Sequence, residues 1–135
     1  MYSHTFRFGG KEPFTTGCTA VVQVRVHGRE LGVDSVLLDI SEAQRLLRGA
    51  MAAYDHKNLD ELEEFQSPRR NTTVEVVAHA VFKRMYEGLK EHHDDLMSFD
   101  GVGLSAVTKM EVSVQESDVA FAGYFEENPQ GLFST

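Results

Sequence analysis

The chain has 135 residues, 41% of them hydrophobic, and its formal net charge at pH 7 is −8. This length and apolar content predict one domain with its own hydrophobic core. Because phosphate-binding surfaces need clustered Lys and Arg, the acidic balance argues against nucleic acid and against anionic membrane surfaces as partners.

Cysteine use and the distribution of apolar residues indicate the cellular compartment. The chain has one cysteine, Cys18, so no internal disulfide can form. No apolar run approaches the roughly 18 residues that a membrane-spanning helix needs. The N-terminal residues lack the basic and apolar blocks of a signal peptide. We therefore expect a soluble, cytoplasmic protein.

Two segments of alternating polarity begin the chain. Residues 2–8 and residues 19–28 each place every second side chain on one face, which predicts two strands. The short break between them predicts a hairpin. The side chains that share the apolar face are Tyr2, His4, Phe6 and Phe8 in the first strand and Ala20, Val22, Val24 and Val26 in the second.

Two helices follow, over residues 38–62 and from residue 72 onward. Each contains near its start a pair typical of a capping box, Ser41 with Gln44 and Thr72 with Glu75. Apolar residues then recur at helical spacing. These are Leu46, Leu47, Ala50, Met51 and Tyr54 in the first helix, and Val77, Val81, Met85 and Leu89 in the second.

Residues 107–116 and 118–125 form two further strands by the same alternation. The order strand, strand, helix, helix, strand, strand predicts an α+β fold, with a four-stranded antiparallel sheet and both helices on one face. Residues 1–125 would form the single domain, and residues 126–135 a C-terminal tail. The free edges of such a sheet favour closure with neighbouring subunits into a barrel.

Five strings resemble the 6-pyruvoyltetrahydropterin synthase family, which includes 6-carboxytetrahydropterin synthase. They are GCTAVVQVRVHG, VLLDISEAQRLL, YDHKNLDEL, NTTVEVVAHAVFKRM and KMEVSVQES, and they span nearly the whole chain. The resemblance implies the tunnelling fold (ββααββ), self-association into a trimer or hexamer, and an active site between subunits that binds a pterin. It also implies a ring-anchoring glutamate, a three-histidine zinc site, and a cysteine with an Asp–His pair that moves protons.

The zinc site is where this chain departs from that family. Thr16-Gly17-Cys18 stands at the family's His-Gly-His, so Cys18 occupies a former ligand position. A catalytic zinc site needs three protein ligands. Cys18 and His4 are two candidates, and the sequence indicates no third. We therefore expect no zinc and no other cofactor.

Asp55, His56 and Glu116 are the strongest candidate site residues. His56 could donate or accept a proton near neutral pH, with Asp55 beside it, whereas the structural alternative is a pair that ends a helix and starts a turn. Glu116 continues the apolar row of Val112 and Val114, where a carboxylate is costly unless paired. The N–H edge of a pterin or guanine would pair with it; the alternative is a strand end at the solvent.

Thr72, Thr73, Glu75 and Cys18 are further candidates for ligand binding. Thr72 and Thr73 could present hydroxyl or N–H groups at a helix N-terminus, while Glu75 is also a capping residue and Cys18 also a pocket-lining one. The leading hypothesis is a divergent, zinc-independent lyase or cyclase that acts on a pterin-like heterocycle, with His56 as acid or base and Glu116 as ring anchor. The alternatives are a non-catalytic pterin- or purine-binding or scaffolding relative, and an authentic 6-carboxytetrahydropterin synthase with displaced zinc ligands.

Overall fold

The computed structural model describes residues 1–6, 14–32, 34–66, 69–93 and 103–133. Phe8 of the first predicted strand lies outside the described residues. The elements in chain order are β1 (Tyr2–Phe6), β2 (Phe14–Cys18), β3 (Val21–Gly28), α1 (Ile40–Ala52), the 3₁₀ turns η1 (Leu59–Glu61) and η2 (Glu63–Phe65), α2 (Val74–Glu91), the 3₁₀ turn η3 (Gly103–Ala106), β4 (Val107–Gln115) and β5 (Phe121–Glu127).

The strands form two antiparallel sheets. One has the order β3-β4-β5, and the other consists of β1 and β2. The predicted single four-stranded sheet is therefore wrong, and so is the predicted hairpin between residues 2–8 and 19–28, because β1 pairs with β2. The string FTTGC of β2 has no alternation of apolar and polar residues. Only its pairing with β1 identifies it as a strand.

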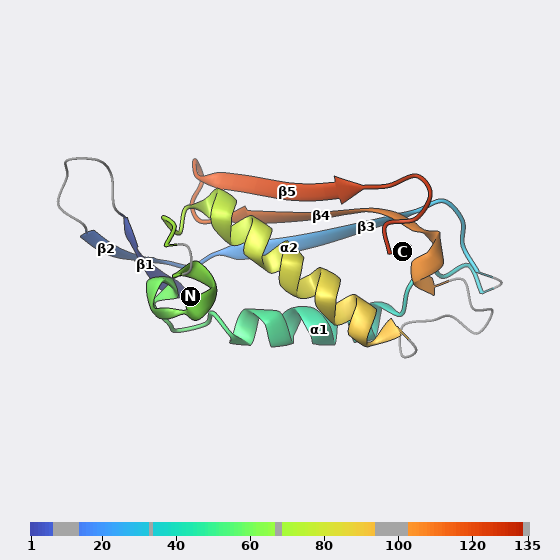
Figure 1. Cartoon of the computed structure of the whole chain (residues 1–135), viewed down its shortest axis with the longest axis horizontal. Helices are drawn as coiled ribbons and strands as arrows, with labels where there is room; N and C mark the ends of the chain where they lie inside the picture. The colour runs from blue at the N-terminus through green and yellow to red at the C-terminus, as the bar shows by residue number, and fades with distance from the viewer. Residues whose placement is uncertain (7–13, 33, 67–68, 94–102, 134–135) are drawn as a thin grey trace.

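Both helices cover one face of the three-stranded sheet, as the sequence predicts (Figure 1). The predicted strand faces are confirmed on β4, where Met110, Val112 and Val114 are fully buried. The side chains that α2 turns inward are buried too, and they are Val77, Val81, Met85 and Leu89. The β1–β2 ribbon extends from the end of the sheet at which β4 finishes (Figure 1). Neither α1 nor α2 is long and apolar enough to cross a membrane.

The helix starts differ from the predicted capping boxes by one or two residues. Asp39 caps α1, and its carboxylate accepts hydrogen bonds from the backbone N–H groups of Ser41 (2.9 Å) and Glu42 (3.3 Å). Thr73, not Thr72, caps α2 by accepting from the N–H of Val76 at 3.3 Å. In each case the residue with extended backbone just before the first turn supplies the cap. This leaves the Thr72 side chain to make a different contact.

The C-terminal residues pack against the domain. β5 continues to Glu127, two residues past the predicted domain end. The backbone N–H of Leu132 donates to the Val107 carbonyl at 2.8 Å, and the Leu132 side chain is buried. The ring of Phe133 stacks on Tyr86 with centroids 4.7 Å apart. The tail thus contributes to the core up to residue 133.

Candidate active site

The pairing of β1 with β2 brings three chemically active side chains to one face. Tyr2 lies opposite Cys18 and His4 opposite Thr16 in the antiparallel register. Directly opposed residues point to the same side of a sheet, and so do residues two positions along. Tyr2, His4 and Cys18 therefore share a face, on which Tyr2 and His4 are almost completely buried.

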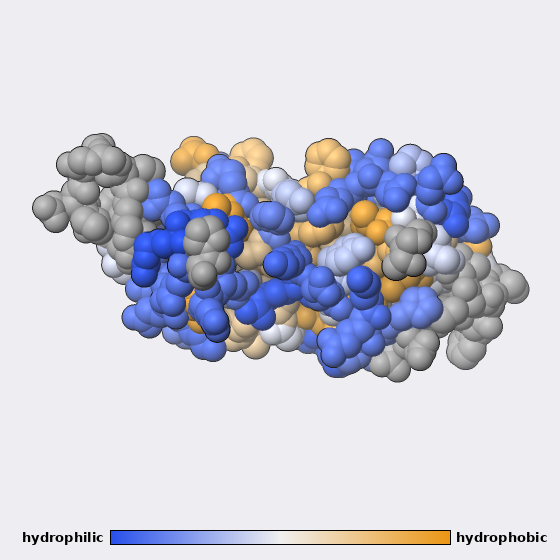
Figure 2. All heavy atoms as spheres, viewed as in Figure 1, coloured by the Kyte–Doolittle hydropathy of each residue, from blue (hydrophilic) through white to orange (hydrophobic). Residues whose placement is uncertain are grey.

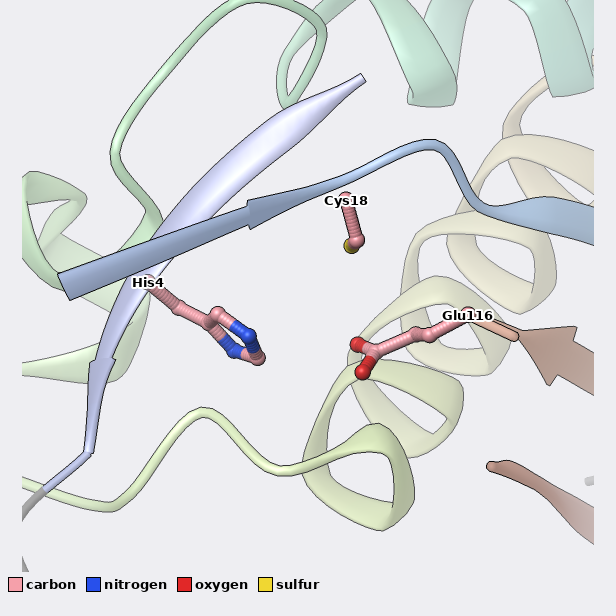
Figure 3. A group of neighbouring side chains, drawn as sticks. All are labelled: His4, Cys18 and Glu116. Carbon is pink, nitrogen blue, oxygen red and sulfur yellow. The ribbon is translucent and has the colours of Figure 1, made fainter. Parts of the chain in front are cut away.

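Glu116 reaches the same place from the other sheet. It follows the last residue of β4. Because every second residue of a strand lies on one face, Glu116 continues the buried row of Val112 and Val114. The ring nitrogen of His4, the sulfur of Cys18 and a carboxylate oxygen of Glu116 all lie within 4.8 Å of one another. Figure 3 shows the three side chains directed at a common point from β1, β2 and the segment just after β4. We call these three residues the His4–Cys18–Glu116 cluster.

Tyr2 connects two members of the cluster. Its hydroxyl donates a short hydrogen bond to Glu116 Oε1, and it lies close enough to the Cys18 thiol to influence the pKa of that thiol. Its ring packs edge-on against the His4 imidazole, with centroids 5.6 Å apart. Burial raises the pKa of Tyr2 far above its usual range, and the hydrogen bond to Glu116 raises it further. Tyr2 is therefore a neutral hydrogen-bond donor at any physiological pH.

The electrostatics of Cys18 favour the neutral thiol. Burial raises the pKa of Cys18, and the negative charge of Glu116 raises it further, while the nearby Tyr2 hydroxyl partly opposes both. A thiol with a raised pKa is a weak nucleophile at neutral pH. The positive charge of the N-terminal ammonium group lowers the pKa of Cys18, but it is outweighed by burial.

A buried chain of hydrogen bonds fixes the orientation of His4. Its Nδ1 lies 2.6 Å from the carbonyl oxygen of Thr72, and the Thr72 hydroxyl donates to Asp60 Oδ2 at 3.2 Å. Because a carbonyl only accepts, Nδ1 carries the hydrogen, and the lone pair of the neutral ring belongs to Nε2. Thr72 is fully buried and Asp60 nearly so. The contact that Thr72 makes to the site therefore runs through its backbone.

The donor set of the cluster fits a zinc ion. Imidazole nitrogen, thiolate sulfur and carboxylate oxygen are the atoms that zinc takes in proteins, and catalytic sites use three such ligands with a fourth position open. A metal-binding histidine commonly donates its other ring N–H to a carbonyl or carboxylate, as His4 does to Thr72. The sequence indicated His4 and Cys18 as candidate ligands, and the structure adds Glu116 as the third.

Asp55 and His56 lie outside this cluster, at the surface after α1. The side chain of His56 is 75% exposed and that of Asp55 50%, with His56 Nε2 3.6 Å from Asp55 Oδ2. Asp55 also accepts from the ammonium group of Met1 at 2.8 Å, and this hydrogen bond lowers the pKa of Asp55. His56 has left-handed backbone (φ 59°), and its N–H donates to the Met1 carbonyl. Their predicted acid–base role is not tested by this geometry.

The other residues that the sequence predicted for ligand binding lie either at the start of α2 or in and around the His4–Cys18–Glu116 cluster. Thr73 is the α2 cap, and Glu75 is exposed in the first turn. Their ligand-binding roles stay predictions. The sequence did not single out Tyr2 or Asp60. It did single out Thr72, but not as a residue that orients a histidine. The alternation in residues 2–8 placed Tyr2 and His4 together, but only the unrecognised strand β2 shows what they face.

These features define a class: small α+β proteins with two helices on a sheet and a polar site where strand ends meet. The chain belongs to one family of that class. Its residues 2–127 match the family described as 6-pyruvoyl tetrahydropterin synthase.

Solved structures of that family have the same fold. The 6-pyruvoyltetrahydropterin synthase of Plasmodium vivax is 17% identical, with 93% of this chain and 89% of that chain covered and a TM-score of 0.70. The Plasmodium falciparum enzyme is 13% identical over 93% and 91%, with a TM-score of 0.69. The Caenorhabditis elegans enzyme is 19% identical over 93% and 90%, with a TM-score of 0.61. No curated protein sequence matches the chain.

Proposed function

We propose that this protein is a lyase of the pterin-synthase type, which acts on a reduced pterin or a closely related heterocycle at the His4–Cys18–Glu116 cluster. The observation that carries the proposal is the convergence of these three groups in a chain that belongs to the 6-pyruvoyl tetrahydropterin synthase family. The relatives named above carry that activity in their names.

Glu116 has two possible partners in such a site. The N–H edge of a pterin would take both carboxylate oxygens, as the sequence predicts for a ring anchor, whereas a metal ion needs only one. The Tyr2 hydroxyl already donates to Oε1. Each carboxylate oxygen has two lone pairs, so Oε1 can accept from Tyr2 and from a ring N–H at the same time. Glu116 can therefore act as ring anchor or as metal ligand in the proposed site.

In the proposed reaction, His56 transfers protons to and from the substrate side chain, and Asp55 supports it. Two observations support this assignment. The imidazole lies 3.6 Å from the Asp55 carboxylate, and it is exposed enough to reach a substrate or a neighbouring subunit. Within this chain the pair does not join the cluster, so the proposal requires the active site to form between subunits.

The test is turnover of reduced pterins that differ in the side chain at C6, with products separated by chromatography after oxidation. The first variant is His56→Asn, because Asn tolerates the left-handed backbone at that position. We expect turnover to fall roughly 10²- to 10⁴-fold, the usual range for loss of a general acid or base, with pterin affinity retained. His79→Ala is the matched control, since His79 is also an exposed histidine but lies on α2 against Tyr124, outside the cluster and the Asp55–His56 pair.

Two outcomes contradict the proposal. Pterin binding without turnover by the unmodified protein would make it a non-catalytic binding relative. Full activity of His56→Asn would remove His56 from the mechanism and leave the cluster as the proton-transfer centre.

A further inference from the structure

We propose that His4, Cys18 and Glu116 form a mixed nitrogen, sulfur and oxygen site for one divalent transition metal ion per chain. The ligand set differs from the three histidines that the family resemblance implies, because a thiolate and a carboxylate take two of the places. The inference goes beyond the proposed reaction, since it concerns what the cluster holds before any substrate arrives.

The first argument is the charge balance of the cluster. Two groups that can become anions, the Cys18 thiol and the Glu116 carboxylate, lie within 4.8 Å of each other and are only partly exposed. Among the residues that the structure describes, no Lys or Arg forms an ion pair with Glu116. Partly buried charges are normally paired or bound to a metal. A divalent cation bound between the two groups would balance their negative charges.

The second argument is the set of contacts that hold the ligands in position. Thr72 and Asp60 orient the imidazole so that Nε2 keeps its lone pair, and Tyr2 holds one oxygen of Glu116. Such outer contacts fix the tautomer and direction of metal ligands. They also explain why the His4 side chain is almost fully buried, with a relative exposure of 1%.

The third argument is the origin of the ligands. They come from β1, the end of β2 and the residue after β4, so the backbones of two antiparallel sheets set their spacing (Figure 3). Soft thiolate and imidazole donors select zinc, cobalt or iron over magnesium and calcium. With three protein ligands, a fourth position stays open for a small molecule, as in catalytic sites.

The experiment uses untagged, full-length protein, made metal-free and titrated with Co²⁺ without any pterin. We expect one Co²⁺ per chain and an absorption band in the near ultraviolet from charge transfer between the Cys18 sulfur and the metal. Zinc should abolish the band by displacement, and metal analysis of the freshly purified protein should show the native ion. Binding should release the thiol proton, so affinity should rise with pH.

Three variants identify the ligands. Cys18→Ser should remove the charge-transfer band, and Glu116→Gln should weaken Co²⁺ binding by more than the roughly 10–100-fold that loss of an outer contact costs. Glu111→Gln is the matched control, because Glu111 is also on β4 but faces away from the helices, beside His27. Circular dichroism spectra establish that each variant is folded. His4→Gln provides a third, independent loss of a ligand.

The results separate this inference from the proposed function. Absence of stoichiometric Co²⁺ binding, or a charge-transfer band that persists in Cys18→Ser, would overturn the metal site. Glu116→Gln protein that keeps full Co²⁺ affinity but loses pterin binding would overturn the assignment of Glu116 as a ligand and return it to ring anchoring. Pterin turnover by metal-free protein would leave the proposed function standing without the metal.

Discussion

The Tyr2 hydroxyl contacts two of the three cluster residues, Glu116 and Cys18. Tyr2→Phe keeps the buried ring and its edge-on packing against His4 but removes the hydroxyl. If the cluster binds a metal, the loss of this donor should lower Co²⁺ affinity roughly 10–100-fold, the usual effect of removing an outer contact. Co²⁺ titration of the variant measures it. Unchanged affinity would show that Tyr2 does not position Glu116 for a metal.

Glu111 gives a pH-dependent prediction at the residue scale. A hydrogen bond from His27, at 2.9 Å, lowers the pKa of Glu111 below its model-compound value of 4.5, and Lys109 lowers it further. A carboxylate with a lowered folded pKa contributes stability above its unfolded pKa and loses it as pH falls through the folded value. We therefore expect NMR titration of the Glu111 carboxyl to give a midpoint below 4.5.

His27→Ala should raise the midpoint of Glu111 toward the ordinary value, because it removes the largest cause of the shift. Lys109→Ala should have a smaller effect in the same direction. A midpoint that does not move in His27→Ala would mean that the pair does not form in solution. Glu111 is exposed to water, so the effect is read from the titration and not from the free energy of unfolding.

At the scale of elements, the start of α1 can be tested directly. Asp39 accepts from the N–H groups of Ser41 and Glu42, whereas the sequence pattern assigns the cap to Ser41. Loss of an N-cap side chain costs about 1 kcal/mol of the free energy of unfolding. We expect that loss for Asp39→Ala in chemical denaturation, little change for Asp39→Asn, and little for Ser41→Ala. A larger loss for Ser41→Ala than for Asp39→Ala would restore the predicted capping box.

The sequence predicts a helix or a strand well where apolar residues keep one regular spacing over a long stretch. The buried face of α2 and the alternating rows of β3 and β4 follow from spacing alone, because each has enough apolar residues to define its face. Strand β2 has no such pattern. Its Thr and Gly residues are held by backbone pairing with β1, which is a property of the partner and not of the string FTTGC.

The candidate site shows the same limit. Parity predicts that Glu116 ends a core-facing row and that His4 faces inward. It does not predict that the two meet, since the ends of β4 and β1 belong to different sheets. Their meeting depends on residues 19–20, which separate β2 from β3 and which the sequence predicted as the start of a strand. The third ligand of the cluster was therefore accessible only from the three-dimensional arrangement.

At the scale of the whole molecule, the face of the three-stranded sheet turned away from the helices carries large apolar side chains. Val21, Phe121 and Phe125 are 56%, 69% and 58% exposed, respectively. In the view of Figure 2, apolar atoms gather along the edge where β5 runs. In the described part of the chain, β3 and β5 each pair with β4 alone, so both outer edges of this sheet are open. Open edges and exposed aromatic residues favour contact with a further chain.

We expect these edges and this face to join copies of the chain, as the resemblance implies for a trimer or hexamer. Light scattering after size-exclusion chromatography should then give three or six times the 15.1 kDa of one chain. Phe121→Glu combined with Phe125→Glu should lower that mass, because two charges would enter an apolar contact without partners. Leu31→Glu is the matched control, since Leu31 is 59% exposed but lies in the loop after β3. If the unmodified protein has a mass of 15.1 kDa at micromolar concentration, the chain is a monomer, and an acid–base role of His56 between subunits is excluded with it.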